Sequence, residues 1–280
     1  MTEVLRYAAF TTDPAGGNPA GIVLDARGLS DVRMQEIAAE VGYSETAFAV
    51  SATEARQYAV RYFSPLTEVA FCGHATIATA VAIAEREGTG PLVFDTPAGI
   101  IEIETTERSG GIAAALRSVP TRSEPAARDD VAAAVMALGW SPEDIDERYP
   151  PHVAFAGNDH LVLAAQSRER LADLDYDFEA LKQLMLQRDW TTLQLFWRQD
   201  DHLVHARDPF PVGGVVEDPA TGAAAAALGG YLRVGRYVSE PSEITIIQGE
   251  DMGRRSELLL TVDPSDPRVT VAGTAVEIAV

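Results

Sequence analysis

The sequence predicts a mixed α+β fold with two similar domains, each built from strands around one buried helix. Short strand-like runs recur between helical segments along the whole chain. Two alanine-rich segments, 74–87 and 220–235, are apolar on nearly every face, which is typical of helices that are buried all round. The order of elements in the first half also recurs in the second half, as an internal duplication would produce.

Composition narrows the class of protein. The 280 residues suffice for one large domain or two ordinary ones, and 46% hydrophobic with 23% charged residues is typical of a globular chain. The net charge of −20 should repel nucleic-acid phosphates and anionic lipid, so we expect neither as a partner. A single cysteine, the lack of a secretory signal at the start and the lack of a long apolar run favour a cytoplasmic location.

The first half predicts two helices among strands. Ser30 is a predicted N-cap of a helix that ends before Gly42, and the second helix is the alanine-rich segment His74–Glu87. The predicted strands are Val4–Phe10, Gly21–Leu24, Glu45–Val50, Tyr58–Phe63, Leu92–Asp95 and Ile100–Glu104.

The pattern restarts near Ile112. The polar segment Arg122–Asp130 is predicted to be a connector that leads into a helix ending near Gly139, and Phe178–Gln187 is an amphipathic helix. The predicted strands are His152–Ala156, Leu161–Ala165, Thr192–Trp197, Leu203–Arg207, Ile244–Gln248 and Leu258–Val262.

Corresponding landmarks place the domain boundary. Phe63-Ser64-Pro65 precedes Gly73 by about the interval at which Phe210-Pro211 precedes Gly222. We therefore expect a degenerate duplication with domains at 1–115 and 116–267. A final strand at about 268–280 can return to the first domain.

Each alanine-rich helix begins at a glycine, Gly73 or Gly222. Small residues allow neighbouring strands to pack closely, which alone accounts for the composition. The first-turn amides and the helix dipole also make a helix N-terminus a site for anions. Two such termini facing each other across a cleft between the domains could hold a carboxylate despite the acidic surface.

Glu45 is a candidate acid/base. By strand alternation it shares a face with Ala47 and Ala49, so its carboxylate would be partly desolvated, as a general acid/base working near neutral pH requires. The alternative is a glutamate at a strand end in open water.

Three further residues carry two interpretations each. Cys72 precedes a helix start, which favours the thiolate of a nucleophile or base, but it could equally be a small buried thiol. His74 is either an acid/base or a helix-cap residue. Asp218, within EDPATG, is either a substrate ligand or a capping and turn residue.

No metal or cofactor site is expected. His202 and His205 are three apart in a predicted strand and so should point to opposite faces, while His152 and His160 flank a turn. The segment GGNPAG, residues 16–21, lacks the spacing of a nucleotide-binding loop and predicts a tight connection between strands.

Several motifs in fixed order resemble the phenazine-biosynthesis isomerase (PhzF-like) family, from residue 10 to residue 256. They are FTTDPAGGNPAGIVLDA, MQEIAAEVGYSETAFA, VRYFSPLTEVAFCGHATIATA, DTPAG, VVEDPATGAAAAALGGYL and IIQGEDMGRRS. The resemblance implies the diaminopimelate-epimerase-like fold, with two pseudo-equivalent domains each wrapped around a central helix, and it implies a homodimer.

The resemblance also implies roles. Glu45 would be the proton carrier, and His74 and Asp218 would bind and orient substrate. Asn18 and the amides of Gly73 and Gly222 would do likewise.

Two positions depart from related patterns. The family often has a serine after DPATG, where this chain has Ala223, and this puts the phenazine precursor in doubt as substrate. Related epimerases use two cysteines; this chain has Cys72 at the first position but Thr221 at the second, so a two-thiol epimerase is excluded.

These observations favour a cofactor-independent isomerase that moves a carbon-bound proton in a small, cyclic or acyclic, carboxylate. A Glu acid/base in the cleft between the domains would carry the proton. The alternatives are a racemase or epimerase with Cys72 as second base, and a non-catalytic protein that binds small molecules with the same fold.

Overall fold

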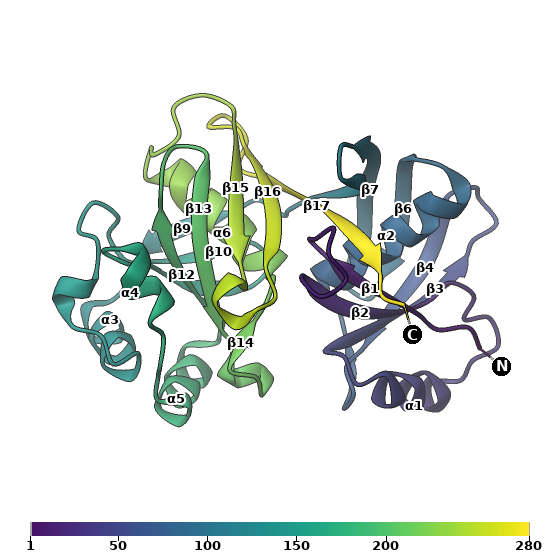
Figure 1. Ribbon diagram of the computed structural model, residues 1–280, viewed down its shortest axis with the longest axis horizontal. Coiled ribbons are helices and arrows are strands. Elements are labelled where there is room, and N and C mark those ends of the chain that lie inside the picture. Colours follow the sequence, from purple (N-terminus) through teal and green to yellow (C-terminus); the bar gives the residue numbers. More distant parts are fainter. Residues whose placement is uncertain (1, 280) are drawn as a thin grey trace. The chain divides into compact units, whose positions relative to one another are not determined.

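Strands and helices alternate along the chain in the computed structural model, which describes residues 2–279 (Figure 1). Residues 2–117 and 272–279 form a first compact unit, and residues 118–271 form a second. Strand β17 (Val269–Glu277) carries the chain from the second unit back to the first, where it pairs with β1. The mixed α+β class predicted from the sequence is confirmed.

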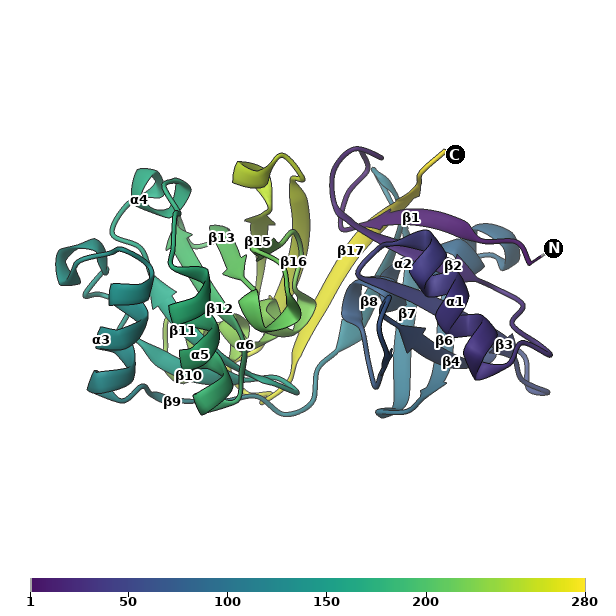
Figure 2. The same ribbon diagram turned by 90° about the horizontal axis from the view of Figure 1, so that it is seen from below.

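The first unit contains two helices. Helix α1 packs on β3 and β4 (Figure 2), and α2 is surrounded by strands. The elements are β1 (Leu5–Ala9), β2 (Asn18–Val23), α1 (Asp31–Val41), β3 (Glu45–Ser51), β4 (Gln57–Phe63), β5 (Glu68–Val69), α2 (Gly73–Glu87), β6 (Gly90–Thr96), β7 (Gly99–Arg108) and β8 (Gly111–Arg117).

The second unit has additional helices that pack against its strands. A core cluster joins α3 and α5 to β11 and β12. The elements are β9 (Arg122–Pro125), α3 (Arg128–Ala137), β10 (His152–Phe155), β11 (Asp159–Ala164), α4 (Arg168–Ala172), α5 (Phe178–Arg188), β12 (Trp190–Arg198), β13 (Leu203–Pro209), β14 (Glu217–Asp218), α6 (Gly222–Val234), β15 (Ser242–Gln248) and β16 (Ser256–Val262), with 3₁₀ turns at Pro142–Asp144, Pro211–Gly213 and Glu250–Met252.

The strand pairings of one unit follow the same order as those of the other. In the first unit, β1–β2 is antiparallel, β2–β3 parallel, β3–β4 and β4–β5 antiparallel, β4–β6 parallel and β6–β7 antiparallel. In the second unit, β10–β11 is antiparallel, β11–β12 parallel, β12–β13 and β13–β14 antiparallel, β13–β15 parallel and β15–β16 antiparallel. In both units a buried helix follows the two-residue strand.

Both alanine-rich helices are buried, as predicted. In α2 all residues from His74 to Ala84 are buried, and the hydroxyls of Thr76 and Thr79 donate to carbonyls four residues earlier, which satisfies their polar atoms. In α6, a Cβ added at Gly230 would lie 2.6 Å from Thr121. Small residues are therefore required for the strands to close around these helices.

In each unit an arginine–glutamate ion pair links the two-residue strand to the neighbouring long strand. Arg61 of β4 donates from Nε and Nη2 to the two carboxylate oxygens of Glu68 at 2.6 and 2.7 Å. Arg207 of β13 donates in the same two-pronged manner to Glu217 at 3.0 and 2.6 Å. The first pair is about one-third exposed (35% and 35%), whereas the second is buried (10% and 3%). Both pairs hold the segment from which the buried helix begins.

Local signals predicted α1 and α5 well. The Ser30 hydroxyl accepts a hydrogen bond from the Arg33 amide, and Gly42 ends α1 with φ of 72°, a left-handed value that favours glycine. The Asp177 side chain caps α5. No helix among residues 2–279 combines the length and apolar composition needed to cross a bilayer.

The structure corrects three details of the sequence analysis. The segment Arg122–Asp130 is not a plain connector, because β9 pairs with β10 and places the Arg122 guanidinium 3.8 Å from the centre of the Phe155 ring. Strand β2 begins at Asn18, three residues earlier than predicted. His202 precedes β13, so strand alternation does not describe its position relative to His205.

The two ion pairs provide a matched test of stability. Glu217→Gln should destabilise the protein by roughly 3–5 kcal/mol, because it leaves the buried Arg207 charge uncompensated. Glu68→Gln should cost less than about 1 kcal/mol, because solvent screens the exposed pair. Urea unfolding of both variants measures the difference, and equal losses would contradict the burial argument.

Candidate active site

Three side chains of the first unit converge where α2 begins. Glu45 is the first residue of β3, Cys72 is the N-cap residue of α2, and His74 is the second residue of that helix. Glu45 Oε2 lies 3.5 Å from Cys72 Sγ and 3.5 Å from His74 Nε2. Cys72 Sγ lies 3.4 Å from His74 Nδ1. A carboxylate, a thiol and an imidazole therefore form one cluster, which we call the Glu45–Cys72–His74 cluster.

The imidazole of His74 is held from both sides. The Asn18 side-chain amide lies 3.2 Å from Nδ1, and the Ser44 hydroxyl lies 3.3 Å from Nε2. Asn18 is buried at the start of β2, so the ring packs against a fixed amide. These contacts orient the ring and select its tautomer.

Burial differs across the cluster. The His74 side chain is 7% exposed, whereas the Glu45 side chain is 21% exposed. Ala47 and Ala49, on the same face of β3 as Glu45, are fully buried. Glu45 is thus neither in open water nor sealed in the core. A partly desolvated carboxylate that remains accessible can exchange a proton with a bound molecule.

The start of α2 lies beside the Glu45–Cys72–His74 cluster. The Cys72 side chain makes no capping hydrogen bond to the helix, and Gly73 carries no side chain that could cover the first turn. The first-turn amides and the helix dipole favour an anion there. Glu45 thus lies beside a helix start of the kind that favours an anion.

The second unit places another polar cluster at the start of α6. Thr221, the N-cap residue, donates its hydroxyl to Asp218 Oδ2. Gln248 connects the two: its side-chain nitrogen donates to the Asp218 carbonyl at 2.8 Å, and its oxygen accepts from the Thr221 amide at 3.3 Å. Gly222 and Ala223 open the helix, and Ala223 offers no hydroxyl.

Asp208 lies in β13 next to this cluster and was not predicted. Its side chain is fully buried, and within residues 2–279 its Oδ2 has no hydrogen-bond partner. The Gln194 amide, in the orientation that hydrogen bonding requires, donates to Asp208 Oδ1 at 3.3 Å and to the Ala224 carbonyl at 3.1 Å. Burial raises the pKa of Asp208 well above its usual range, and the nearby carboxylates of Asp218 and Glu217 act in the same direction.

The predicted site residues therefore fall into two groups. The structure brings five of them together at α2 and four at the start of α6. The first group is Asn18, Glu45, Cys72 and His74 with Gly73 between the last two; the second is Asp218, Thr221, Gly222 and Ala223.

Sequence reasoning missed three polar side chains in these groups. Ser44 adjoins Glu45, and Gln248 lies in the IIQGEDMGRRS motif, so both had a local signal. Asp208 had only the weak signal of a charged residue at the end of an apolar strand.

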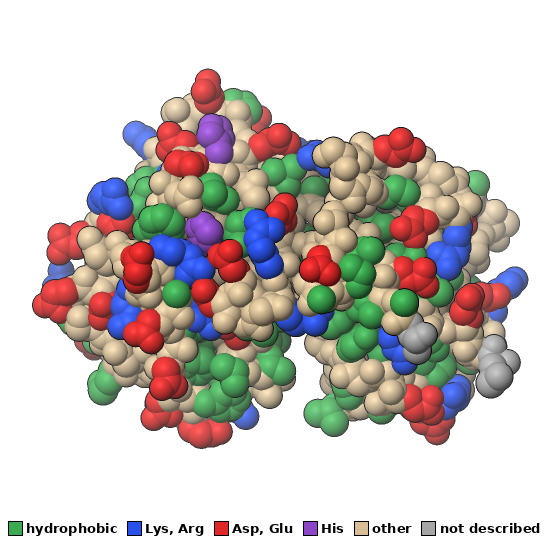
Figure 3. Space-filling model, in the orientation of Figure 1, with side chains coloured by type: hydrophobic (Ala, Val, Ile, Leu, Met, Phe, Trp, Pro, Cys, Tyr) green, Lys and Arg blue, Asp and Glu red, His purple; other side chains and the backbone are tan. Residues whose placement is uncertain are grey.

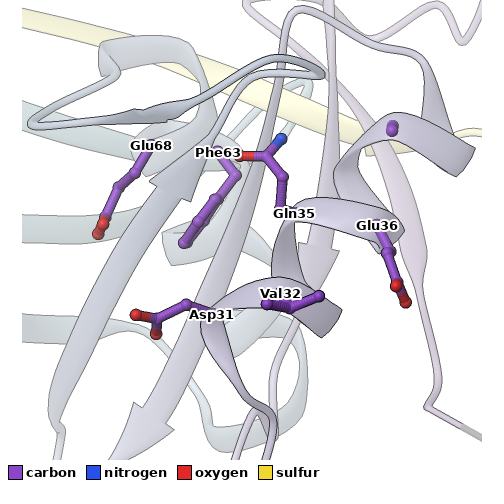
Figure 4. A pocket seen from close by; sticks show the side chains of 7 residues that line it. Asp31, Val32, Gln35, Glu36, Phe63 and Glu68 are labelled. Carbon is purple, nitrogen blue, oxygen red and sulfur yellow. The ribbon is translucent and has the colours of Figure 1, made fainter.

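A groove elsewhere in the first unit contains none of the predicted site residues. It has a volume of about 530 Å³, and side chains of α1, β4 and β5 line it (Figure 4). Asp31, Glu36 and Glu68 give it an acidic rim, and Asp31 and Glu68 are paired with Arg61. An acidic groove does not fit an anionic substrate.

Acidic side chains are spread over the visible faces of both units, in keeping with the net charge of −20 (Figure 3). Such a surface repels anions at long range. An anionic ligand must therefore be held by local donors, and backbone amides at a helix start supply them.

Comparison with known proteins identifies the family. The family model described as phenazine biosynthesis-like protein matches residues 7–279. An uncharacterized isomerase (YfhB) of Bacillus subtilis is 31% identical over 98% of this chain and 96% of its own. A trans-2,3-dihydro-3-hydroxyanthranilate isomerase of Pseudomonas chlororaphis is 31% identical over 99% of this chain and 97% of its own. The protein is an isomerase of the PhzF type.

Solved structures agree with this assignment. A phenazine biosynthesis protein of the PhzF family from Bacillus anthracis superposes with a TM-score of 0.88 at 27% identity, over 99% of this chain and 98% of that one. A hydroxyproline epimerase from Agrobacterium vitis shares only the fold, with a TM-score of 0.64 at 12% identity over 99% and 91%. The chain belongs to the phenazine biosynthesis-like (PhzF) family, as its motifs had indicated.

The raised pKa of Asp208 predicts that the difference in unfolding free energy between the wild type and Asp208→Asn changes with pH. The folded protein keeps the Asp208 proton above about pH 4, where the carboxyl of the unfolded chain releases it. Wild-type stability should therefore fall relative to Asp208→Asn as the pH rises from 4.5 towards 8, by more than about 1 kcal/mol over that range. Urea unfolding of both proteins across this range measures the difference; a difference that is constant with pH would show that Asp208 is ionised in the folded state.

Proposed function

We propose that the protein isomerises a small carboxylate by moving a carbon-bound proton, with Glu45 as the proton carrier and no cofactor. The observation that carries the proposal is the position of Glu45 Oε2, 3.5 Å from both the imidazole of His74 and the thiol of Cys72 on a partly buried side chain. The name of the Pseudomonas chlororaphis relative, a dihydro-hydroxyanthranilate isomerase, supports the same reaction class.

The proposed reaction needs one acid/base group. The Glu45 carboxylate removes a proton from a substrate carbon, and the electron pair of that C–H bond moves into the conjugated system of the substrate. The protonated Glu45 then returns the proton to a different carbon, so one C–H bond breaks, another forms and no net oxidation occurs. His74, oriented by Asn18 and Ser44, holds a polar group of the substrate beside Glu45.

The substrate carboxylate is assigned to helix-start amides. The first turn of α2 lies beside Glu45, and neither Cys72 nor Gly73 covers it with a capping side chain. Asp218 is proposed to orient a hydroxyl or amino group of the substrate. Because Ala223 lacks the hydroxyl that many family members have here, we expect a substrate that differs from the phenazine precursor in its polar groups.

We also infer that the two units descend from one duplicated domain. The six strand pairings recur in order, and the pairing Tyr62↔Val69 corresponds to Asp208↔Asp218. In this correspondence Arg61–Glu68 matches Arg207–Glu217, and both are two-pronged ion pairs. Cys72 then matches Thr221, and His74 matches Ala223. The second unit therefore lacks counterparts of the Cys72 thiol and the His74 imidazole, which supports Glu45 in the first unit as the single proton carrier.

Glu45→Gln should reduce turnover by more than about 10²–10⁴-fold without unfolding the protein, because the amide cannot carry a proton. Cys72→Ala is the matched comparison and should lose less than about tenfold, because no second cysteine completes a two-thiol pair. The first test substrate is trans-2,3-dihydro-3-hydroxyanthranilate, followed by cyclic and amino-acid carboxylates that raise the melting temperature. Circular dichroism checks the fold of each variant.

The outcome separates the alternatives. A folded Glu45→Gln variant that keeps more than about a tenth of the rate would overturn the assignment. If Cys72→Ala is as inactive as Glu45→Gln, the racemase with Cys72 as second base becomes the better account.

Heavy water tests the reaction class directly. While Glu45 holds the proton it can exchange with solvent, so wild-type enzyme should introduce deuterium at carbon and Glu45→Gln should not. An isomerase labels a new position on a rearranged skeleton, whereas a racemase labels an inverted stereocentre. Proton NMR with chiral chromatography distinguishes them. Carboxylates that stabilise the protein but remain unlabelled and unrearranged would leave only a binding function.

A further inference from the structure

The Glu45–Cys72–His74 cluster presents one ligand atom of each kind that zinc accepts. The thiol sulfur, an imidazole nitrogen and a carboxylate oxygen all lie within 4.8 Å of one another. Cys72 and His74 are buried, and Glu45 is partly exposed, so the cluster can be reached from one side. Sequence spacing did not predict this set, because Glu45 lies 27 residues before Cys72.

The separations match those of a coordination sphere. Zinc binds thiolate at about 2.3 Å, imidazole at about 2.0–2.1 Å and carboxylate at about 2.0–2.2 Å, so tetrahedral angles place ligand atoms roughly 3.3–3.6 Å apart. The observed separations are 3.5 Å from Glu45 Oε2 to Cys72 Sγ, 3.5 Å from Glu45 Oε2 to His74 Nε2 and 3.8 Å from Cys72 Sγ to His74 Nε2. The three separations are within a few tenths of an ångström of these values. Because Sγ lies 3.4 Å from Nδ1, closer than to Nε2, the imidazole must also turn for Nε2 and Sγ to bind one ion.

One neighbour must turn for an ion to bind at Nε2. The Asn18 side chain approaches Nδ1 of His74 to 3.2 Å through its NH2 group, which is a donor. When it presents its oxygen instead, it accepts the Nδ1 proton and fixes the orientation of the ligating imidazole. Three protein ligands leave a fourth position for water or substrate. A thiolate and a carboxylate together would also neutralise a divalent charge.

We propose that Glu45, Cys72 and His74 form a binding site for a thiophilic divalent cation such as Zn²⁺, and that its occupancy stops the isomerisation. The binding site stands on the cluster geometry alone, and its inhibitory effect rests on the proposed function. The metal would occupy the Glu45 oxygen that accepts the substrate proton, so a loaded enzyme lacks its proton carrier. Mg²⁺ and Ca²⁺ prefer oxygen ligands and should bind poorly.

Cobalt reports the site without any activity measurement. Co²⁺ titrated into the reduced full-length protein should give a thiolate-to-cobalt charge-transfer band in the near ultraviolet and intense visible bands of tetrahedral cobalt, saturating at one equivalent. Because Cys72 is the only cysteine, the charge-transfer band has one source. Added Zn²⁺ should displace the cobalt and remove both sets of bands, whereas Mg²⁺ should not.

Substitutions locate the other ligands. Cys72→Ser should abolish the charge-transfer band, and Glu45→Gln and His74→Gln should each weaken cobalt binding by at least about tenfold. The control is His202→Gln, because His202 is an exposed histidine of the second unit and represents adventitious binding by a surface histidine. That variant should bind cobalt like the wild type. Absence of the charge-transfer band, or cobalt affinity that Glu45→Gln and His74→Gln leave unchanged, would overturn the site.

The inhibitory effect is tested separately. Zn²⁺ at saturation should reduce wild-type turnover at least about tenfold, and removal by a chelator should restore it. Undiminished turnover in the zinc-loaded protein would refute the inhibition, whereas an active metal-free Glu45→Gln variant would refute the proposed function. The cobalt spectra depend on neither result.

Discussion

The point at which each buried helix begins is fixed by the short strand before it, and the polar chemistry of both units depends on this constraint. In each unit an arginine of the preceding long strand donates two hydrogen bonds to a glutamate of the short strand. The pairs are Arg61–Glu68 and Arg207–Glu217. The helix that follows consists largely of small residues, so strands close around it and it cannot slide without opening voids. The unpaired amides of its first turn are thereby held in a defined place.

Strand register completes the arrangement in the first unit. Strand β2 pairs in parallel with β3 so that Ala20 lies opposite Glu45, and Asn18 lies two residues earlier on β2. Asn18 and Glu45 consequently meet the same helix start from neighbouring strands. Side chains alternate along a strand, so a shift of one residue would turn Glu45 to the opposite face and dismantle the cluster.

The sequence predicted the elements that depend on interactions between residues close in the chain. The apolar pattern and the caps Ser30 and Gly42 gave α1, and uniform apolarity gave α2 and α6. Strand β9 was missed because a polar segment pairs as a strand only when a partner such as β10 is available, and no short-range pattern shows that.

The same limit applies to the candidate site, where only the residues that are neighbours in sequence could be grouped from the sequence pattern. Cys72 and His74 are neighbours in sequence, but Glu45 lies 27 residues before Cys72, and its place beside them came from family resemblance rather than from periodicity. Asp208 was not predicted because its burial depends on tertiary packing. An aspartate at a strand end is ordinarily solvated, but here β13 pairs with both β12 and β15, and α6 packs on β12.

Asp208 has a counterpart that gives its position a wider meaning. In the matching strand of the first unit the corresponding residue is Tyr62, whose hydroxyl lies 2.6 Å from the Thr76 hydroxyl inside α2. Corresponding positions near the two buried helices thus carry the phenol of Tyr62 in the first unit and the carboxyl group of Asp208 in the second. The ion pairs and the small-residue helices stabilise the framework of each unit. The residue type at such a buried position can therefore differ between the units without changing the fold. Under the duplication proposed above, two initially equal units can become unequal one residue at a time, with each unit keeping its framework while its buried polar groups change.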